Sequence, residues 1–204
     1  HLGPNDFYYW DDFWGIAGLR AGCSMLRMLG ENGVADELLE NSRDFMRAVD
    51  ASLDEVKTRM GHDASPAAPT RRMDAGAIGS LAGGYPLQLW RADDPRLAAT
   101  ADYLADKCFL DDAFYQEISH SGINAYLTLH VAQVMLRAGN DRFFDFVEAI
   151  ADFASPTGQW PEAVHPRTGG GCMGDGQHVW AAAEWVLMMR NIFVYEEEAD
   201  SKLV

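Results

Sequence analysis

The chain has 204 residues, of which 48% are hydrophobic, and this length and apolar content predict a single domain over residues 1–204 with one substantial core. The formal net charge of -15 excludes a nucleic-acid surface, which needs clustered cations, and no apolar stretch is long and uncharged enough to span a membrane. The 3 cysteines are widely spaced and odd in number, which disfavours a disulfide framework and favours a reducing, cytoplasmic location.

Helical periodicity dominates the sequence, and no run of alternating β-branched residues bounded by turns is found. We therefore predict an all-α protein. The segment 33–60 has one apolar stripe and a charged opposite face, which is typical of an outer helix. Segments that are apolar on nearly all sides are typical of helices enclosed by other helices, and these are 11–29, 121–138 and 177–194. A further helix is expected from Pro95, after an acidic cap, and another along the stripe of Phe143, Phe144, Val147 and Ile150.

The joints between the predicted helices resemble one another. Three of them are LRMLGENG at 26–33, LWRADDP at 89–95 and MLRAGND at 135–141. Each follows an apolar helix and leads into a helix with a more polar face, which is a weak repeat of helical hairpins. Inner helices joined to outer helices by short turns form an α/α toroid. Long loops then fall at the opposite end, where such loops are usually functional, and they are 61–86, 109–121 and 155–176.

Two segments place carboxylates among aromatic rings. FYYWDDFWG (7–15) holds Asp11 and Asp12 at the start of a helix, and GQWPEAVHPRTGGGCMGDGQHVWAAAEW (158–185) holds Glu162 in a glycine-rich loop. Glycoside hydrolysis needs one protonated carboxyl to donate to the leaving oxygen and one ionised carboxylate to activate water or attack the sugar. From the residues alone, an aspartate at a helix start most often caps the helix, and a loop glutamate can simply be solvated.

Other side chains in these segments are candidates for binding sugar, with capping or solvation as the alternative for several of them. They are Trp10, Asp12, Trp14, Arg71, Glu117, His120, Asn124, Trp160, His165, Arg167, Asp175, His178 and Trp180. His130, between Leu129 and Val131, fits a core histidine whose hydrogen bonds are satisfied. No CxxC or HExxH spacing and no Walker or dinucleotide loop is present, so we expect neither a metal nor a cofactor.

The WDDF motif at 10–13 resembles the Trp-Asp-Ser-Phe and Arg-Asp-Thr-Phe motifs of six-hairpin glycosidases, the superfamily of glycogen-debranching α-1,6-glucosidases, processing α-glucosidases and trehalases. The segment from Gly158 is similar to their Gly-x-Leu-Pro-Glu loop, which precedes a glycine-rich turn and an apolar helix. The resemblance implies an (α/α)6 toroid in which Asp11 is the general acid and Glu162 the general base. Trp160 replaces the family's Leu, and Asp12 its Ser or Thr, which implies a different substrate subsite.

Six hairpins need twelve helices, whereas the sequence predicts about seven, so the resemblance covers the later part of the family's catalytic domain. We expect an incomplete toroid, about half to two-thirds of the barrel, which N-terminal hairpins of the same enzyme or another chain would complete. Exposed inner apolar surface leads us to expect self-association. Two functions follow: a glycoside hydrolase that cleaves an oligo- or polysaccharide by acid and base catalysis with inversion, or a non-catalytic carbohydrate-binding or scaffold piece. They differ in whether Asp11 and Glu162 face one open pocket.

Overall fold

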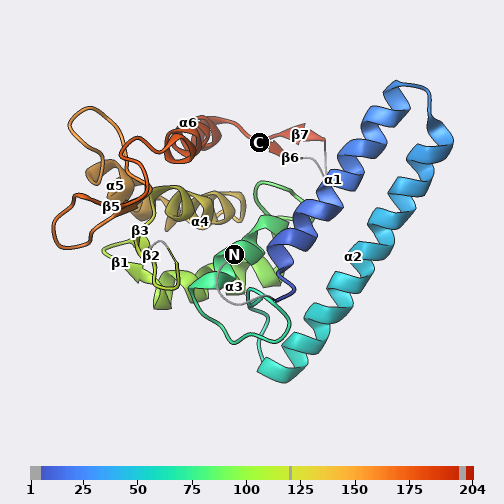
Figure 1. The fold of residues 1–204 in the computed structure, drawn as a ribbon, viewed down its shortest axis with the longest axis horizontal. Helices are drawn as coiled ribbons and strands as arrows, with labels where there is room; N and C mark the ends of the chain where they lie inside the picture. Colours follow the sequence, from blue (N-terminus) through green and yellow to red (C-terminus); the bar gives the residue numbers. More distant parts are fainter. Residues whose placement is uncertain (1–5, 120, 198–200) are drawn as a thin grey trace.

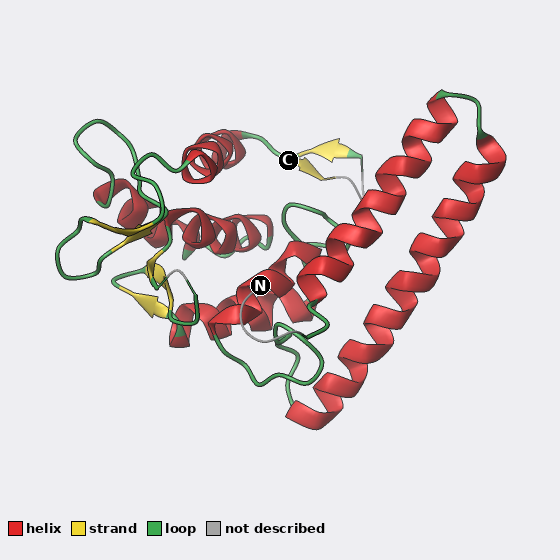
Figure 2. Cartoon of the chain, viewed as in Figure 1, coloured by secondary structure: helices red, strands yellow, loops and turns green. Residues whose placement is uncertain are grey.

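The computed structural model describes residues 6–119, 121–197 and 201–204. Over these residues the chain is predominantly helical, which confirms the all-α prediction (Figure 2). The helices are α1 (Tyr9–Met28), α2 (Asn32–Met60), the 3-10 helix η1 (Ala75–Gly83), α3 (Pro95–Lys107), α4 (Ala125–Arg137), α5 (Phe143–Asp152) and α6 (Val179–Phe193).

The helices are arranged as successive hairpins along an arc. α1 packs on α2, η1 on α3 and α4 on α5, while α1, η1, α4 and α6 contact one another in this order and form the inner layer. Figure 1 shows α1 and α2 as a long antiparallel pair, with α4 and α6 neighbouring each other on the opposite side. Apolar helices therefore alternate with amphipathic ones, as the repeated joints predicted.

The centre of the inner layer is α4, which is buried over nearly its whole length. The preceding inner element, η1, lies within the segment predicted as a loop at 61–86, and all of its residues are buried. Its sequence, AGAIGSLAG, lacks the large side chains that would reveal helical periodicity. Small residues are required here, because a Cβ atom on Gly79 would lie 3.3 Å from Cβ of Trp10, and one on Gly83 would lie 2.6 Å from Cε3 of Trp90. Close approach of backbone to rings thus explains why the inner layer uses glycine at these positions.

Short strands that the sequence did not predict lie in two of the predicted long loops, 109–121 and 155–176, and at 122–123, where the sequence predicted the start of a helix that begins at Ala125. The strands are β1 (Phe109–Leu110), β2 (Ala113–Gln116), β3 (Gly122–Ile123), β4 (Ala163–Val164) and β5 (Gly171–Met173). They form an antiparallel sheet in the order of the sequence, and in it Ile123 pairs with Val164. Strands this short carry no readable alternation of apolar and polar residues. The sheet joins the loop after Trp160 to the start of α4. A separate small hairpin, β6 (Glu196–Glu197) and β7 (Lys202–Leu203), follows α6.

The two ends of the arc expose apolar side chains. On α1, Met28 is 88% exposed and Met25 is also open to solvent; on α6, Phe193 is 87% exposed and Val186 is also open. The sequence predicted both helices to be enclosed on nearly all sides. Their exposure is what an arc of hairpins leaves at its free ends, because those faces have no neighbouring hairpin among the described residues.

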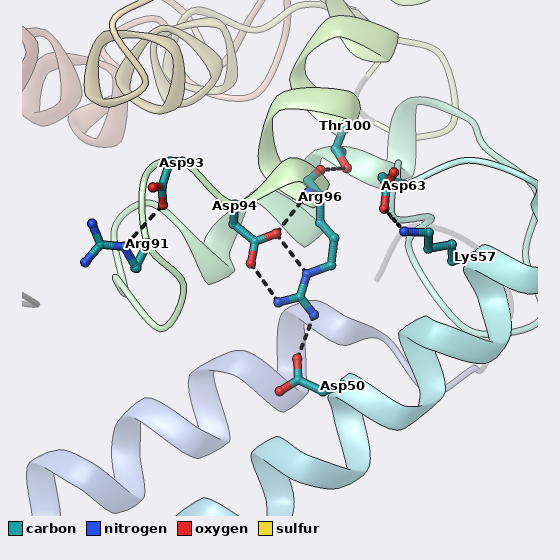
Figure 3. Close-up of polar contacts among 8 residues, drawn as sticks. All are labelled: Asp50, Lys57, Asp63, Arg91, Asp93, Asp94, Arg96 and Thr100. Atoms are coloured by element: carbon teal, nitrogen blue, oxygen red, sulfur yellow. Dashed lines mark hydrogen bonds and ion pairs between the residues drawn. The ribbon is translucent and has the colours of Figure 1, made fainter.

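The outer helices α2 and α3 are joined by a polar network around Arg96 (Figure 3). Its guanidinium donates to Asp50 on α2 over 2.6 Å and to both carboxylate oxygens of Asp94, over 2.7 and 2.9 Å. Asp94 also accepts from the backbone N–H of Arg96 and so caps α3, with Pro95 at the first helical position, as the sequence predicted. Burial would raise the pKa of Asp94, but the hydrogen bonds and charge of Arg96 outweigh it and hold the pKa below its usual 3.8.

Replacing Asp94 with Asn is expected to lower the free energy of unfolding by about 1–2 kcal/mol at pH 7, because Asn still caps the helix but loses the charge-assisted bonds to Arg96. A carboxyl whose folded pKa is depressed stabilises the fold above its unfolded pKa, and this contribution is lost as the pH falls through the lower folded value. The difference between the two proteins should therefore be constant near neutrality and shrink below pH 3.8 in urea unfolding curves. Asp93→Asn, which breaks only the exposed pair with Arg91, is the control and should change stability by less than about 0.5 kcal/mol. An equal loss in the two variants would contradict the assignment.

Candidate active site

A cavity of about 370 Å³ opens among the inner elements, a volume within the range of small-ligand sites. Its walls come from all four elements of the inner layer and from the segments that precede α1 and η1. The lining residues are Tyr8, Trp10, Asp11, Ala67, Gly76, Ile78, Gly79, Tyr126, Leu127 and Trp180. Most of this lining is aromatic or glycine, and Asp11 is its acidic side chain.

The two adjacent aspartates at the start of α1 face different surroundings. Asp11 is exposed and lines the cavity, whereas Asp12 is half-buried and does not line it. Burial and the neighbouring charge of Asp11 raise the pKa of Asp12. Burial raises the pKa of Tyr9, and the charge of Asp12 raises it further; the Tyr9 hydroxyl shares a hydrogen bond with Ser52 of α2 over 2.8 Å. Asp12 therefore lies toward α2 and Asp11 toward the cavity, as expected for residues about 100° apart on a helix.

Neither aspartate caps α1. The N-cap residue is Tyr8, whose side chain makes no capping hydrogen bond. Both carboxylates lie in that first turn, where the helix dipole favours negative charge.

Glu162 is fixed through its backbone. Its N–H donates to the carbonyl of Asp175 over 3.1 Å, and its own carbonyl accepts from the side-chain amide of Asn124 over 3.0 Å. Its carboxylate packs against Gly174, where a Cβ atom would lie 1.9 Å from Oε2, and Gly174 also has a φ of +70°. The glycine-rich turn thus leaves space for the glutamate side chain, which a larger residue would occupy.

Tyr126 lines the cavity with one of the predicted catalytic carboxyls and is influenced by the charge of the other. Its ring lines the cavity together with Asp11. Burial, followed by the charge of Glu162, raises the pKa of Tyr126 to about 12. Glu162 itself is not among the residues that line the cavity. Tyr126 of α4 is therefore the lining residue that relates the cavity to both segments in which the sequence predicted chemistry.

The rings of Trp10, Tyr126 and Trp180 form one wall of the cavity, and those of Trp14 and His178 contact them without lining it. The ring centroids of Trp10 lie 5.6 Å from Trp14 and 6.5 Å from Trp180, and Trp180 lies 4.7 Å from Tyr126. His178 follows, 4.9 Å from Tyr126. Apolar ring faces with a carboxyl between them suit the apolar faces and hydroxyl edges of sugars.

Some of the predicted sugar-binding residues support the cavity without lining it. Arg71 forms an ion pair with Asp74 over 3.0 Å and donates to the hydroxyl of Tyr8 over 3.4 Å. The ring of His178 meets Asp175 at 3.4 Å.

Further candidates lie away from the cavity. Trp160 is only 4% exposed and donates its indole N–H to the carbonyl of Ile150, so it belongs to the core. Glu117, His165 and Arg167 are exposed and do not line the cavity. His120 lies outside the described residues.

Several lining residues were not predicted. Tyr8 stands inside the FYYWDDFWG segment, and Tyr126 follows the predicted Asn124 by two positions, so both were next to a signal. Gly76, Ile78 and Gly79 carried no signal, because they lie in the short helix that the sequence left as a loop.

No group of three or more His, Cys, Asp or Glu side chains in the described part of the chain is placed to hold a metal ion. Among the same residues, none of the helices has the length and apolar character needed to cross a membrane.

The fold is that of a glucoamylase-like α/α toroid, as comparison with solved structures shows. No protein-family model matches the sequence, and neither does any curated protein. The structure superposes on a bacterial glucoamylase solved in complex with acarbose, with a TM-score of 0.69 and 16% identity, over 92% of this chain and 33% of the glucoamylase. It also superposes on a glycosidase, solved as the wild type and as variants, with a TM-score of 0.56 and 16% identity, over 87% of this chain and 52% of that one. The chain thus spans about a third of the glucoamylase and half of the glycosidase, which confirms the predicted partial toroid.

Proposed function

We propose that this chain carries the acid and the base of a glycoside hydrolase that cleaves an oligo- or polysaccharide with inversion. The observation that carries the proposal is the cavity itself, in which Asp11 lies among Tyr8, Trp10 and Trp180. Glu162 does not line the cavity, but its charge acts on the lining residue Tyr126. The glycosidase fold of the superposed structures supports the same chemistry. The substrate is a carbohydrate, and no cofactor takes part.

In the proposed reaction Asp11 gives its proton to the glycosidic oxygen as the bond to the anomeric carbon breaks. A water molecule attacks that carbon from the opposite face of the ring, and Glu162 accepts the proton which the water loses. The cavity aromatics stack on the sugar and keep bulk water away. Because both backbone groups of Glu162 are hydrogen-bonded, the backbone that carries the proposed base is fixed before substrate arrives.

We further propose that additional hairpins complete the ring, supplied by the N-terminal part of the same enzyme or by another chain. The exposed apolar faces of α1 and α6 support this, as does the share of the superposed chains that this chain spans. Such hairpins would cover Met28 and Phe193 and close the cavity around the substrate.

The test of the proposed function is a panel of glycosides, with the anomer first released identified by NMR. Inverting chemistry predicts that the anomer of opposite configuration appears first, with the carboxyl groups of Asp11 and Glu162 roughly 6.5–9.5 Å apart to admit a water. If the retained anomer appears first, Glu162 is not a base that activates water, and a spacing near 5 Å is expected instead.

A second function remains open because the arc leaves its ends uncovered: a non-catalytic carbohydrate-binding or scaffold piece. A titration with acarbose, followed by tryptophan fluorescence, distinguishes the two functions when combined with the glycoside panel. Quenching together with turnover supports the hydrolase, whereas quenching without turnover of any glycoside, by the full-length enzyme, supports the binding piece.

A further inference from the structure

A buried carboxyl, that of Glu184, lies directly behind the aromatic wall of the cavity. Glu184 is on α6, one helical turn after Trp180, and is 7% exposed. Burial raises its pKa, an effect only partly offset by the hydrogen bonds it receives. Burying an ionisable group costs free energy unless the group is hydrogen-bonded, so such a residue needs a structural or functional reason.

Each oxygen of this carboxyl accepts one hydrogen bond. The indole N–H of Trp180 donates to Oε1 over 3.3 Å, and the hydroxyl of Tyr85 donates to Oε2 over 2.9 Å. Glu184 therefore connects a ring that lines the cavity to a ring in the core. The two donors lie 95 positions apart in the chain and are brought together only by the packing of the inner layer.

The anchor at the core end is rigid. Tyr85 is buried, and its ring meets the ring of His130 edge-on, with centroids 5.5 Å apart. The guanidinium of Arg137 lies 5.6 Å from the centroid of the Tyr85 ring. Burial and the charge of Glu184 raise the pKa of Tyr85 far above its usual range, so its hydroxyl keeps its proton and always donates.

Trp180, by contrast, needs support. It is the second residue of α6 and is 41% exposed, with its neighbour Val179 almost fully open to solvent. An exposed side chain at a helix start can adopt several rotamers, and ordering it on ligand binding costs entropy. A hydrogen bond to a fixed acceptor removes that freedom before the ligand arrives.

We propose that Glu184 is a positioning residue that transmits the rigidity of the core through Tyr85 to the indole of Trp180, and so holds this ring as the cavity wall on which a sugar stacks. The sugar part of this inference rests on the proposed function; the positioning of the indole does not.

The test follows the indole N–H groups of the six tryptophans in the 15N-labelled full chain. The Trp180 resonance is assigned by its absence in Trp180→Phe. In Glu184→Leu, which has a similar size but no acceptor, this resonance should move and its exchange with water should quicken about tenfold, the effect of losing about 1.4 kcal/mol of protection. The indoles of Trp90 and Trp160, which neither adjoin Glu184 nor contact Trp180, should stay in place, because a general loosening of the fold would move them as well.

Two conservative variants keep the inference falsifiable if Glu184→Leu does not fold. Glu184→Gln retains an acceptor, so the Trp180 resonance should shift slightly and its exchange should stay slow. Tyr85→Phe removes the core anchor alone and should broaden the Trp180 resonance. Glu148→Gln removes a charge from an exposed position on α5 and is the control. An unmoved Trp180 resonance in every folded variant at positions 184 and 85 would overturn the proposal.

Adding acarbose to the wild-type chain separates this inference from the proposed function. If Glu184→Leu frees the indole but acarbose moves none of the cavity resonances, the positioning role stands and the sugar-binding function fails. If acarbose moves the Trp180 resonance equally in the wild type and in Glu184→Leu, with the same affinity, sugar binding stands and the positioning role is wrong.

Discussion

Asp11→Asn is expected to lower kcat by about 10²–10⁴-fold on glycosides with poor leaving groups, the usual contribution of a general acid. Asparagine keeps the shape of the side chain but has no proton to give to the leaving oxygen. Substrate binding should change little, so the loss falls on kcat and not on KM. On substrates with good leaving groups, which need no protonation, the kcat of Asp11→Asn should be much closer to that of the wild type. The measurement is steady-state kinetics of the full-length enzyme on paired substrates that differ only in the leaving group.

The neighbouring aspartate is the matched control for this experiment. Asp12 has the same chemistry and lies one position along α1, but it is directed toward Tyr9 and α2. Asp12→Asn should therefore alter stability or binding and leave the dependence on the leaving group intact. The reverse pattern, with Asp12→Asn inactive and Asp11→Asn nearly normal, would move the acid by one residue and undo the alignment of WDDF with the family motif.

The fold is also expected to lose about 3 kcal/mol of stability between pH 6.5 and pH 4 through His130 alone. This histidine is 2% exposed on α4, so it lies in the core as predicted, but its Nε2 has no hydrogen-bond partner among the described residues. Burial lowers its pKa from 6.5 to about 4 despite the backbone carbonyls near it. In the unfolded chain the imidazole gains a proton below pH 6.5, whereas in the folded protein it stays neutral down to about pH 4. Proton binding therefore stabilises the unfolded state as the pH falls through this window, and the free energy of unfolding decreases.

Urea unfolding at a series of pH values compares the wild type with His130→Gln, which has no titrating group. The wild type should lose its advantage over the variant as the pH falls from 6.5 toward 4, and the two curves should run parallel below that window. Parallel curves throughout would mean that His130 takes up a proton inside the folded protein.

The sequence was most informative where large side chains repeat at helical spacing. α2 and α5 were predicted from their apolar stripes, and α3 from its Asp-Pro start, because each pattern follows from burying one face of a helix. η1 was missed because alanine and glycine leave no stripe, although its burial is complete. The strands β1–β5 were missed because two to four residues are too few for alternation to be seen.

The candidate site was predictable in part for a related reason. Asp11 and Trp180 belong to segments whose composition is unusual in itself, so local sequence pointed to them. Gly79 and Glu184 are ordinary residues locally and gain their place only when distant elements pack together. For Trp160 the composition of its segment was misleading. The sequence predicted that this ring binds sugar, but the loop folds back and buries it in the core.

The walls of the cavity come from opposite ends of the chain, from Tyr8 near the start to Trp180 near the end. Such contacts close very large loops. Closing a large loop slows folding because the chain loses conformational entropy before the new contact stabilises the fold. We therefore expect the cavity to be completed after the separate hairpins have formed. Because α1 and α6 both line the cavity, local unfolding of either helix would open it, and protection of these helices from proteolysis is expected to report whether the cavity is assembled.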